Sequence, residues 1–279
     1  MTGAADDLAA LAVVPLGGDR FRAAPGLPPD TAFPHLFGGR PLAFGLLAAG
    51  QTVGDDRVPH AVHASFLRAG DGREPLDIEV VRDTDGRSFS ARRVVVSQGD
   101  RRIFTMTASF HTTEAGPATQ HRTMPPDVPP PEALLPREPP LGHRDGIMEV
   151  RNVGVADPTL FPTTAWARAA GRLPADEPLL HAAVLLHFSD LYAGLPPLAD
   201  GRGGPSLDHA FWLHDVPDMN DWVLMHLEPS ASGNGRGLYV GSFFDRSGRH
   251  VASIAQEMLY STSRQPRQLP TWQQEEKEP

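Results

Sequence analysis

Cysteine is absent from this 279-residue chain, and lysine occurs once, at Lys277. Without cysteine, disulfide bonds, cysteine nucleophiles and zinc–thiolate sites are excluded. Because Lys277 lies in the polar tail, Schiff-base chemistry on a buried lysine is excluded as well. The formal net charge of −9 argues against general nucleic-acid binding, which needs a basic surface to neutralise phosphates.

Long apolar segments are also missing. No uninterrupted apolar run reaches the roughly 20 residues of a membrane-spanning helix, so we expect no membrane span. The first residues, MTGAADDLAALAVV, are acidic, whereas a secretory signal begins with basic residues. The last residues, EKEP, match neither a retention signal nor a peroxisomal signal. We therefore expect a cytoplasmic protein.

Proline divides the chain. Its density between residues 117 and 145 prevents a regular helix or a central strand, which indicates a linker. We predict an N-terminal unit at 1–116, a linker at 117–145, a C-terminal unit at 146–264 and a polar tail at 265–279. The two units have similar lengths, and each is long enough to bury a hydrophobic core.

The two units repeat one pattern of elements. Each is predicted to contain a lead-in strand, one buried helix and several long antiparallel strands. The helices are expected within 33–53, which is apolar almost all round from Leu42 onward, and within 177–194. Turn sequences such as DTDG, SQGD and DRSG separate the strand-like segments. The expected strands lie within 60–70, 75–86, 87–100, 101–110, 206–216, 222–232, 236–248 and 250–259.

A sheet wrapped around one hydrophobic helix, present twice in a chain, is typical of a tandem hotdog. The predicted fold class is therefore α+β, with two long antiparallel sheets that each wrap around a central helix. The likeness of SFLRAGD to AFWLHDV, and of IFTMTASF to VASIAQEM, favours a duplication. The repeat is far longer than the roughly 20 to 50 residues of a solenoid unit.

Longer segments carry a more specific resemblance. The first unit contains LFGGRPLAFGLLAAGQTV, HASFLRAGD and SFSARRVVVSQGDRRIFTMTASF, followed by EAG and TMPP. The second contains IMEVRNV, FSDL, SLDHAFWLH and HVASIAQEML. In this order, the segments resemble the acyl-CoA thioesterase II family of the TesB type, which has a double-hotdog fold. The resemblance covers most of the chain outside the linker and the tail.

The resemblance implies hydrolysis of acyl-CoA to a free fatty acid and CoA, within fatty-acid and lipid metabolism. It also implies a site made of Asp190 in SDL, Ser206 two positions before DH, and Gln256 in QE. The family often has threonine where this chain has Ser206, and either hydroxyl can donate and accept a hydrogen bond. The loop from Asp190 to Ser206 is shorter than in familiar relatives, and we expect it to shape the acyl tunnel.

These three residue types suit direct hydrolysis of a thioester. Asp190 follows an apolar run where an unpaired charge is costly, and it can accept a proton from water. Ser206 and Gln256 can hold that water in line. No G-x-S-x-G turn surrounds any serine, so a covalent acyl-enzyme is not expected. Oxyanion donors are expected among backbone N–H groups at the start of a hotdog helix. Neither a cofactor nor a metal ion is expected.

Two alternatives stay open. A hotdog hydratase or dehydratase acting on enoyl thioesters usually needs a histidine–aspartate pair, and His187 lies near Asp190 in the sequence. A non-catalytic protein that binds acyl-CoA could have kept the pocket and lost turnover, and serine in place of threonine at position 206 leaves room for that.

Other polar residues have plainer explanations. Asp208, two positions beyond Ser206, is either a second acid or a structural partner of an arginine, and the structural role is favoured. His60 and His63 lack the further ligands that a metal needs, so we expect strand histidines with ordinary partners. GNGRG at 233–237 lacks the lysine and hydroxyl of a phosphate-binding loop and is expected to relax a strand end.

Arginines concentrated in the first unit are candidates for contacts to the phosphates of CoA, because a guanidinium suits bidentate phosphate binding. An ordinary surface charge is the simpler explanation for any single one. They are Arg57, Arg68, Arg73, Arg82, Arg87, Arg92, Arg93, Arg101 and Arg102.

One competent site per chain is expected, in the C-terminal unit. The corresponding place in the first unit holds FGGRPLAFG, which has no carboxylate. The first unit is then expected to serve architecture and part of the ligand tunnel. Acyl-CoA is the expected small-molecule partner, and the resemblance implies a homodimer or a larger homo-oligomer.

Overall fold

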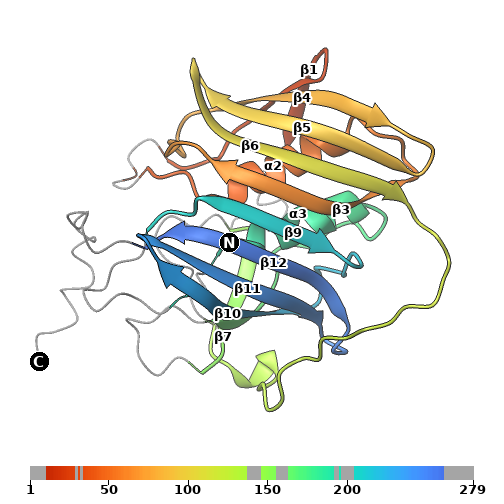
Figure 1. Ribbon diagram of the computed structural model, residues 1–279, viewed down its shortest axis with the longest axis vertical. Helices are drawn as coiled ribbons and strands as arrows, with labels where there is room; N and C mark the ends of the chain where they lie inside the picture. Colours follow the sequence, from red (N-terminus) through yellow and green to blue (C-terminus); the bar gives the residue numbers. More distant parts are fainter. Residues whose placement is uncertain are drawn as a thin grey trace, which may run out of the picture.

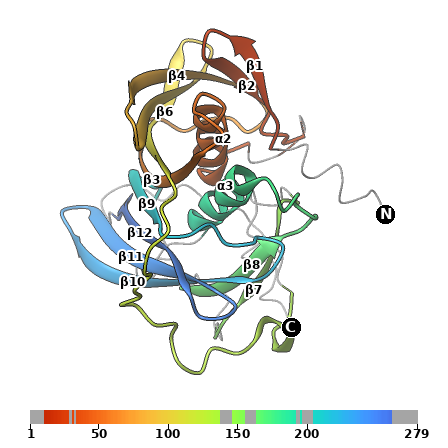
Figure 2. The same cartoon turned by 90° about the vertical axis from the view of Figure 1, so that its right-hand side faces the viewer.

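The computed structural model describes residues 11–28, 31, 34–136, 146–154, 163–191, 195 and 204–260 of the chain. Within these ranges the chain forms one antiparallel sheet of 12 strands and two α-helices (Figure 1). The sheet curls around the helices, as Figure 2 shows from the side. The α+β class and the tandem hotdog predicted from the sequence are confirmed.

The two halves contribute equivalent elements. The first half holds helix α2 (Gly39–Gly50) and strands β1 (Val13–Gly17), β2 (Arg20–Ala23), β3 (Arg57–Phe66), β4 (Leu76–Asp85), β5 (Phe89–Gln98) and β6 (Arg101–Thr112). The second half holds helix α3 (Pro178–Ser189) and strands β7 (Met148–Asn152), β8 (Thr164–Ala169), β9 (Asp208–Leu213), β10 (Val223–Gly233), β11 (Arg236–Asp245) and β12 (His250–Leu259).

Strand order shows how the halves join. The first half runs β1-β2-β4-β5-β6-β3 across the sheet, and the second continues as β9-β12-β11-β10-β8-β7, which is the same order reversed. Strands β3 and β9 pair antiparallel, with Ala61 opposite Trp212 and Ser65 opposite Asp208. The two sheets expected from the sequence are therefore halves of one continuous sheet.

Each half begins with two strands rather than the single lead-in strand that the sequence pattern predicts. The β1–β2 pair is a hairpin, and β7 pairs with β8 in the same way. Four of the five residues of β1 are exposed, so β1 lacks the alternation of apolar and polar residues that marks a half-buried strand. For that reason the sequence pattern does not predict β1 as a separate strand.

The two helices lie side by side inside the curl of the sheet (Figure 2). In α2 every residue from Gly39 to Ala49 is buried, and in α3 every residue from His181 to Ser189 is buried. Neither described helix is long and apolar enough to cross a membrane. Helix α3 ends at Ser189, and residues 192–194 of the predicted helix lie outside the described residues.

Glycine allows the two helices to approach closely at both ends. A Cβ atom on Gly39 would lie 2.5 Å from the backbone oxygen of His187, near the end of α3. A Cβ on Gly50 would lie 2.3 Å from the side chain of Leu179, at the start of α3. The helices are thus antiparallel, and the start of each meets the end of the other.

The described part of the predicted linker, 117–136, contains only the short 3₁₀-helix η1 (Pro131–Ala133), and it contacts the second half. Trp166 Nε1 donates to the carbonyl of Pro129, and Arg151 donates to the carbonyls of Pro131 and Leu134. The GNGRG segment forms the two-residue turn between β10 and β11. Asn234 and Gly235 have φ of 52° and 75°, as in the tight turns that join hairpin strands.

Candidate functional site

Asp190 is the residue that caps the C-terminal end of α3. Its backbone N–H donates to the carbonyl of Phe188, and its φ of −97° and ψ of 7° leave the helical range. The preceding residue, Ser189, lies with its hydroxyl 2.7 Å from the carbonyl of Leu186, a local bond that competes with the helical pattern. Asp190 is therefore the first residue after the helix. Only its place in the fold decides what it meets there.

The three predicted site residues lie together. Ser206 Oγ donates to Asp190 Oδ1 over 3.1 Å, and Gln256 Nε2 donates to the same oxygen over 2.9 Å. Gln256 Nε2 also lies 2.6 Å from Ser206 Oγ. Gln256 projects inward from β12, and Ser206 is placed beside that strand by a bridge to Met258. Residues separated by up to 66 positions thus form one hydrogen-bonded cluster.

The first half also contributes to this cluster, at the N-terminal end of α2. The backbone N–H of Gly39 donates to the Asp190 carboxylate. A Cβ on Gly38 would lie 2.4 Å from Asp190 Oδ2 and 2.8 Å from the Phe66 ring, so the backbone passes directly beside the carboxylate. The sequence placed the site in the second half alone. The cluster of candidate residues lies between the halves, and FGG before the first helix was the available signal for the contribution of the first half.

Burial without a neighbouring cation makes Asp190 unusual. Removal from water raises the pKa of its carboxyl to about 6, although hydrogen bonds from Gln256, Ser206 and Gly39 act in the opposite direction. In the described part of the chain, no arginine or histidine forms an ion pair with it. Part of the residue stays accessible to solvent. It is therefore a partly accessible residue whose carboxylate binds a proton far more readily than that of an ordinary aspartate.

His209 is a member of the cluster that sequence reasoning missed. It is fully buried on β9, with Nδ1 against Gln256 Oε1 and Nε2 at 2.9 Å from Ser189 Oγ. Burial lowers the pKa of His209 to about 4, with the Gln256 contact acting the other way. A signal was available, because His209 alternates with buried Phe211 and Leu213 and so belongs to the core face of its strand.

Three other histidines contact groups other than the Asp190 carboxylate. The ring of His187 packs edge-on against Phe37, with centroids 4.9 Å apart. His60 lies 2.7 Å from Ser109 Oγ, and His63 packs against Trp212. No group of three or more potential metal ligands occurs among the described residues.

Asp208 is exposed and accepts the backbone N–H of Glu257 over 2.8 Å. The favoured structural role is confirmed, but the partner is a backbone amide rather than the expected arginine. A strand-to-strand bond suffices to hold this side chain, because Asp208 begins β9 directly beside β12.

The nine candidate arginines divide into two groups. Arg57, Arg73, Arg82, Arg92 and Arg93 each have a carboxylate within 4.0 Å. In the described ranges, no such partner accompanies Arg68, Arg87, Arg101 or Arg102. Arg68 Nη1 donates to the carbonyl of Arg102, and Arg101 Nη2 donates to the carbonyl of Ala69. Arg68 and Arg102 flank Phe66 and Phe104, whose rings are 5.4 Å apart, so they lie near the Gly38 side of the cluster.

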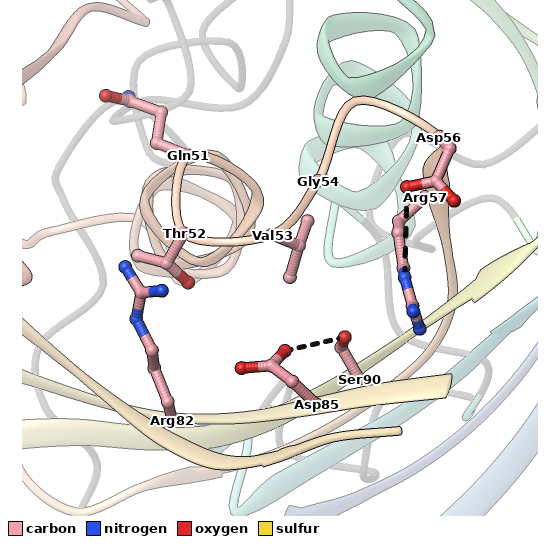
Figure 3. A pocket seen from close by; sticks show the side chains of 9 residues that line it. All are labelled: Gln51, Thr52, Val53, Gly54, Asp56, Arg57, Arg82, Asp85 and Ser90. Atoms are coloured by element: carbon pink, nitrogen blue, oxygen red, sulfur yellow. Dashed lines mark hydrogen bonds and ion pairs between the residues drawn. The ribbon is translucent and has the colours of Figure 1, made fainter. Parts of the chain in front are cut away.

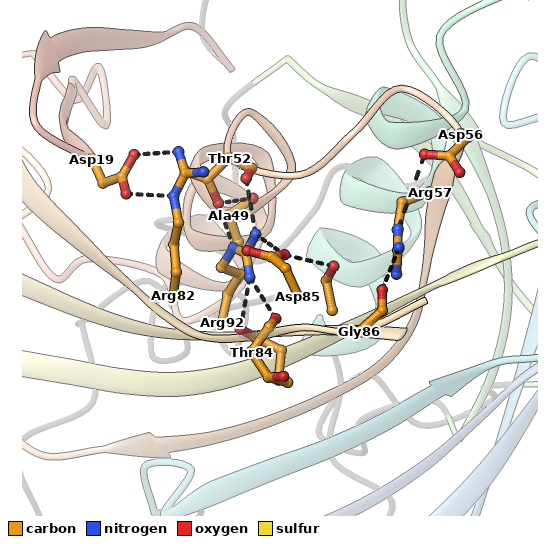
Figure 4. Close-up of polar contacts among 12 residues, drawn as sticks. Asp19, Ala49, Thr52, Asp56, Arg57, Arg82, Thr84, Asp85, Gly86 and Arg92 are labelled. Carbon is orange, nitrogen blue, oxygen red and sulfur yellow. Dashed lines mark hydrogen bonds and ion pairs between the residues drawn. The ribbon is translucent and has the colours of Figure 1, made fainter. Parts of the chain in front are cut away.

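A cavity of about 460 Å³ lies at the other end of α2, lined by Gln51, Thr52 and Asp85 among others (Figure 3). Beside it, the buried guanidinium of Arg92 donates from all five N–H positions (Figure 4). The acceptors are the Thr52 hydroxyl and carbonyl, the carbonyls of Thr84 and Ala91, and the Asp85 carboxylate. An α-helix of this length spans about 18 Å, so this cavity is separate from the Asp190 cluster.

Family models match both halves. One described as the acyl-CoA thioesterase N-terminal domain matches residues 27–111, and one described as the acyl-CoA thioesterase C-terminal domain matches residues 117–260. This chain belongs to the acyl-CoA thioesterase family. The family predicted from the sequence segments is thereby confirmed.

Individual members of the acyl-CoA thioesterase family are similar over most of the chain. Acyl-CoA thioesterase 2 of Haemophilus influenzae is 32% identical over 261 residues, which span 82% of this chain and 89% of that protein. Human acyl-coenzyme A thioesterase 8 is 30% identical over 254 residues, 80% of this chain and 79% of that protein. The solved structure of acyl-CoA thioesterase II TesB2 from Mycobacterium marinum has a TM-score of 0.76 and 31% identity, covering 95% of this chain and 100% of that one.

Proposed function

We propose that this chain hydrolyses acyl-CoA thioesters to a free fatty acid and CoA, with Asp190, Ser206 and Gln256 as the catalytic residues. The observation that best supports this proposal is the environment of the Asp190 carboxylate. Asp190 has a pKa raised to about 6, lies at the N-terminal end of α2, and is held by neutral donors only. A base with a pKa near the working pH is well matched to taking a proton from water. Membership of the acyl-CoA thioesterase family supports the choice of substrate.

In the proposed reaction, Asp190 takes a proton from water while the water oxygen attacks the thioester carbon. The tetrahedral intermediate then collapses, the carbon–sulfur bond breaks, and the proton held by Asp190 passes to the departing thiolate of CoA. Ser206 and Gln256 orient the water and the carboxylate through the contacts that join all three side chains. No covalent acyl-enzyme forms on this route.

The negative charge on the intermediate needs a stabilising group. The N-terminal end of α2 carries the positive end of the helix dipole, and it lies directly beside the Asp190 carboxylate because Gly38 and Gly39 have no side chains. We assign the oxyanion site to this helix start.

Arg68, Arg101 and Arg102 are the arginines proposed to contact the phosphates of CoA. They are exposed, they lack a carboxylate partner, and they follow or precede the aromatic pair beside Gly38. Asp100 lies in the same β5–β6 turn and reduces the local positive charge. The expected contribution is therefore to substrate affinity rather than to turnover.

Cellular context and assembly belong to the same proposal. We propose a cytoplasmic enzyme of fatty-acid and lipid metabolism that forms a homodimer or a larger homo-oligomer, as the family resemblance implies. The unit boundaries at 116 and 146 and the start of the tail at 265 are proposed on the proline-rich composition. The loop expected to shape the acyl tunnel falls mainly on residues 192–194 and 196–203, outside the described residues.

A thiol-release assay with acyl-CoA substrates from short to long chain length tests the function. The proposal predicts CoA release that depends on enzyme concentration for at least one chain length. Binding of acyl-CoA without release at any length would favour the non-catalytic alternative. Loss of the enoyl absorbance from an enoyl-CoA, with no thiol released, would favour the hydratase. The ring of His187 packs edge-on against Phe37, which disfavours that outcome.

A further inference from the structure

A continuous chain of buried polar side chains runs from the end of α3 to the Asp190 carboxylate. Ser189 Oγ lies 2.9 Å from His209 Nε2, and His209 Nδ1 contacts Gln256 Oε1. Gln256 Nε2 lies 2.9 Å from Asp190 Oδ1 and 2.6 Å from Ser206 Oγ. Ser189, His209 and Gln256 are each at most 2% exposed, so water is not an alternative partner for them.

The amide of Gln256 can be placed in two orientations of nearly the same shape. In the observed one, its NH₂ group donates to Asp190 and to Ser206. In the reversed one, its carbonyl oxygen would face an ionised carboxylate, and two acceptors would meet with no proton between them. Because nitrogen and oxygen are similar in size, packing alone cannot select the productive orientation. A neighbouring donor has to select it.

His209 can supply that donor only if its proton is on Nδ1. Burial lowers the pKa of His209 to about 4, so the ring is neutral at neutral pH and carries a single proton. With the proton on Nδ1, that nitrogen donates to Gln256 Oε1 and Nε2 becomes an acceptor. A buried acceptor on Nε2 then requires its own donor.

Ser189 meets that requirement. Its hydroxyl lies 2.7 Å from the carbonyl of Leu186 and 2.9 Å from His209 Nε2, and its one proton can serve only one of them at a time. If the proton went to Leu186, His209 would have to donate from Nε2, and a bare Nδ1 would face Gln256 Oε1. If it goes to His209, every contact from Ser189 to Asp190 has one donor and one acceptor, and the Leu186 carbonyl gives up its bond from Ser189.

We propose that His209 is a positioning residue which, as the Nδ1–H tautomer held by Ser189, fixes the Gln256 amide with its NH₂ toward Asp190. The protons of Ser189, His209, Gln256 and Ser206 then all point toward the carboxylate. The consequence for turnover rests on the proposed function, because the fixed amide keeps Asp190 ionised and Ser206 in place. The tautomer itself is a property of the folded protein and does not depend on any activity.

The tautomer can be measured directly in the wild-type protein. Long-range ¹H–¹⁵N correlation of the histidine rings at pH 7, assigned with His209→Asn as the reference, distinguishes a protonated Nδ1 from a protonated Nε2. We expect His209 to carry its proton on Nδ1. A proton on Nε2 would overturn the proposal, whether or not the protein releases CoA.

Two substitutions at His209 test the consequence. In His209→Asn, the side-chain amide can still donate at the Nδ1 position, so turnover should stay near that of the wild type. In His209→Leu the donor is lost, and kcat should fall by about 10- to 100-fold with little change in KM. Equal kcat values for the two folded variants would contradict the proposal.

The pH profile separates positioning from a merely structural role. The Gln256 N–H lowers the pKa of Asp190, so its loss in His209→Leu should move the apparent pKa of kcat upward from about 6. His209→Asn should leave that pKa in place. Of the groups that face the Gln256–Asp190 pair, His209 titrates near 4, and burial raises the pKa of Tyr239 further above its ordinary value. An unchanged profile in His209→Leu would mean that His209 only fills space.

Failure of the proposed function gives a different result. A wild-type protein that released no CoA from any acyl chain would remove the catalytic assignment, and the ring spectrum would still decide the tautomer.

Discussion

Two carboxylates, one at each end of the helix pair, have pKa values that are shifted in opposite directions. Asp85, beside the C-terminal end of α2, accepts a bond from the buried Arg92 guanidinium, and that contact lowers the pKa of Asp85. Asp190, beside the N-terminal end of α2, has only neutral donors, and burial raises its pKa to about 6. The fold places polar groups at both ends, yet a saturated ion pair occupies one end and a carboxylate with a raised pKa occupies the other.

The difference follows from which half supplies the charge. At the C-terminal end of α2, the cation is Arg92 on β5. All five of its N–H donors are occupied, so it has no hydrogen-bonding capacity left for a substrate. At the N-terminal end of α2, the charged group is Asp190, which directly follows α3, and part of this residue stays accessible to solvent. The two ends of the helix pair therefore differ, because one holds a saturated ion pair and the other a carboxylate with a raised pKa, the kind of group that clusters at functional sites.

Among the changes that test this comparison of the two ends, the largest effect is expected from Gly38→Ala. The new Cβ would lie 2.4 Å from Asp190 Oδ2, so the carboxylate must move and turnover should fall by about 100-fold or more. Gly45→Ala in the same helix is the matched control, because its Cβ would meet only the flexible side chains of Met106 and Val94. Thiol release by both purified variants checks this. Equal turnover would show that the start of α2 is not part of the site.

Arg92→Met tests the opposite end. Loss of the guanidinium removes its bonds to the Thr52 and Thr84 carbonyls, and the free energy of unfolding should fall by about 2 to 4 kcal/mol. The kcat of the remaining folded protein should not change. Urea denaturation with thiol release measures both, and Arg93→Met on the same strand is an exposed control whose ion pair is worth about 1 kcal/mol or less. A large drop in kcat would break the proposed division between the ends.

The pH dependence of kcat should report the raised pKa. A base must be ionised to accept a proton, so kcat should fall about tenfold per pH unit below the apparent pKa and level off above it. We expect that pKa at about 6. Steady-state rates between pH 4.5 and 8 would show it. A midpoint near that of an ordinary aspartate would mean that the burial of Asp190 is relieved when substrate binds.

The smallest effect is expected from the unpaired arginines. Arg68→Ala and Arg102→Ala should each raise KM for acyl-CoA several-fold at low ionic strength, with kcat unchanged, because exposed charges contribute modestly and are screened by salt. Arg93→Ala, which removes an arginine already paired with Asp83, is the control. If all three variants had the same KM, the phosphates would bind elsewhere.

Much of this arrangement could be predicted from residues close together in the sequence. The apolar runs around Leu42 and Leu185 predict both core helices, because a helix that is hydrophobic all round must be buried. Asp190, Ser206 and Gln256 were identified through family segments rather than through spacing. That the three meet is a consequence of the order of β9 and β12 in the sheet.

Other parts depend on contacts between distant segments. The approach of Gly38 and Gly39 to Asp190 depends on the antiparallel packing of two helices from different halves, which no local pattern specifies. The position of His209 indicates burial but not its partners. The opposite pKa shifts of Asp85 and Asp190 depend on whether a guanidinium is within reach, which only the folded structure decides.

The stability of an Asp190→Asn variant provides the control for the decisive experiment. A carboxyl whose pKa is raised on folding destabilises the folded state once the pH exceeds its unfolded pKa, and the penalty is complete above about pH 6. A shift from 3.8 to about 6 corresponds to at most about 3 kcal/mol. Asp190→Asn should therefore be no less stable than the wild type at pH 7, and any gain in stability should shrink as the pH falls toward 4.

The central claim is that Asp190 activates the attacking water. The most direct measurement is the rate of CoA release by folded Asp190→Asn at pH 7, compared with the wild type on the best substrate of the acyl-CoA series. The account predicts a loss of about 100- to 10,000-fold with the fold intact. A rate near that of the wild type would contradict it.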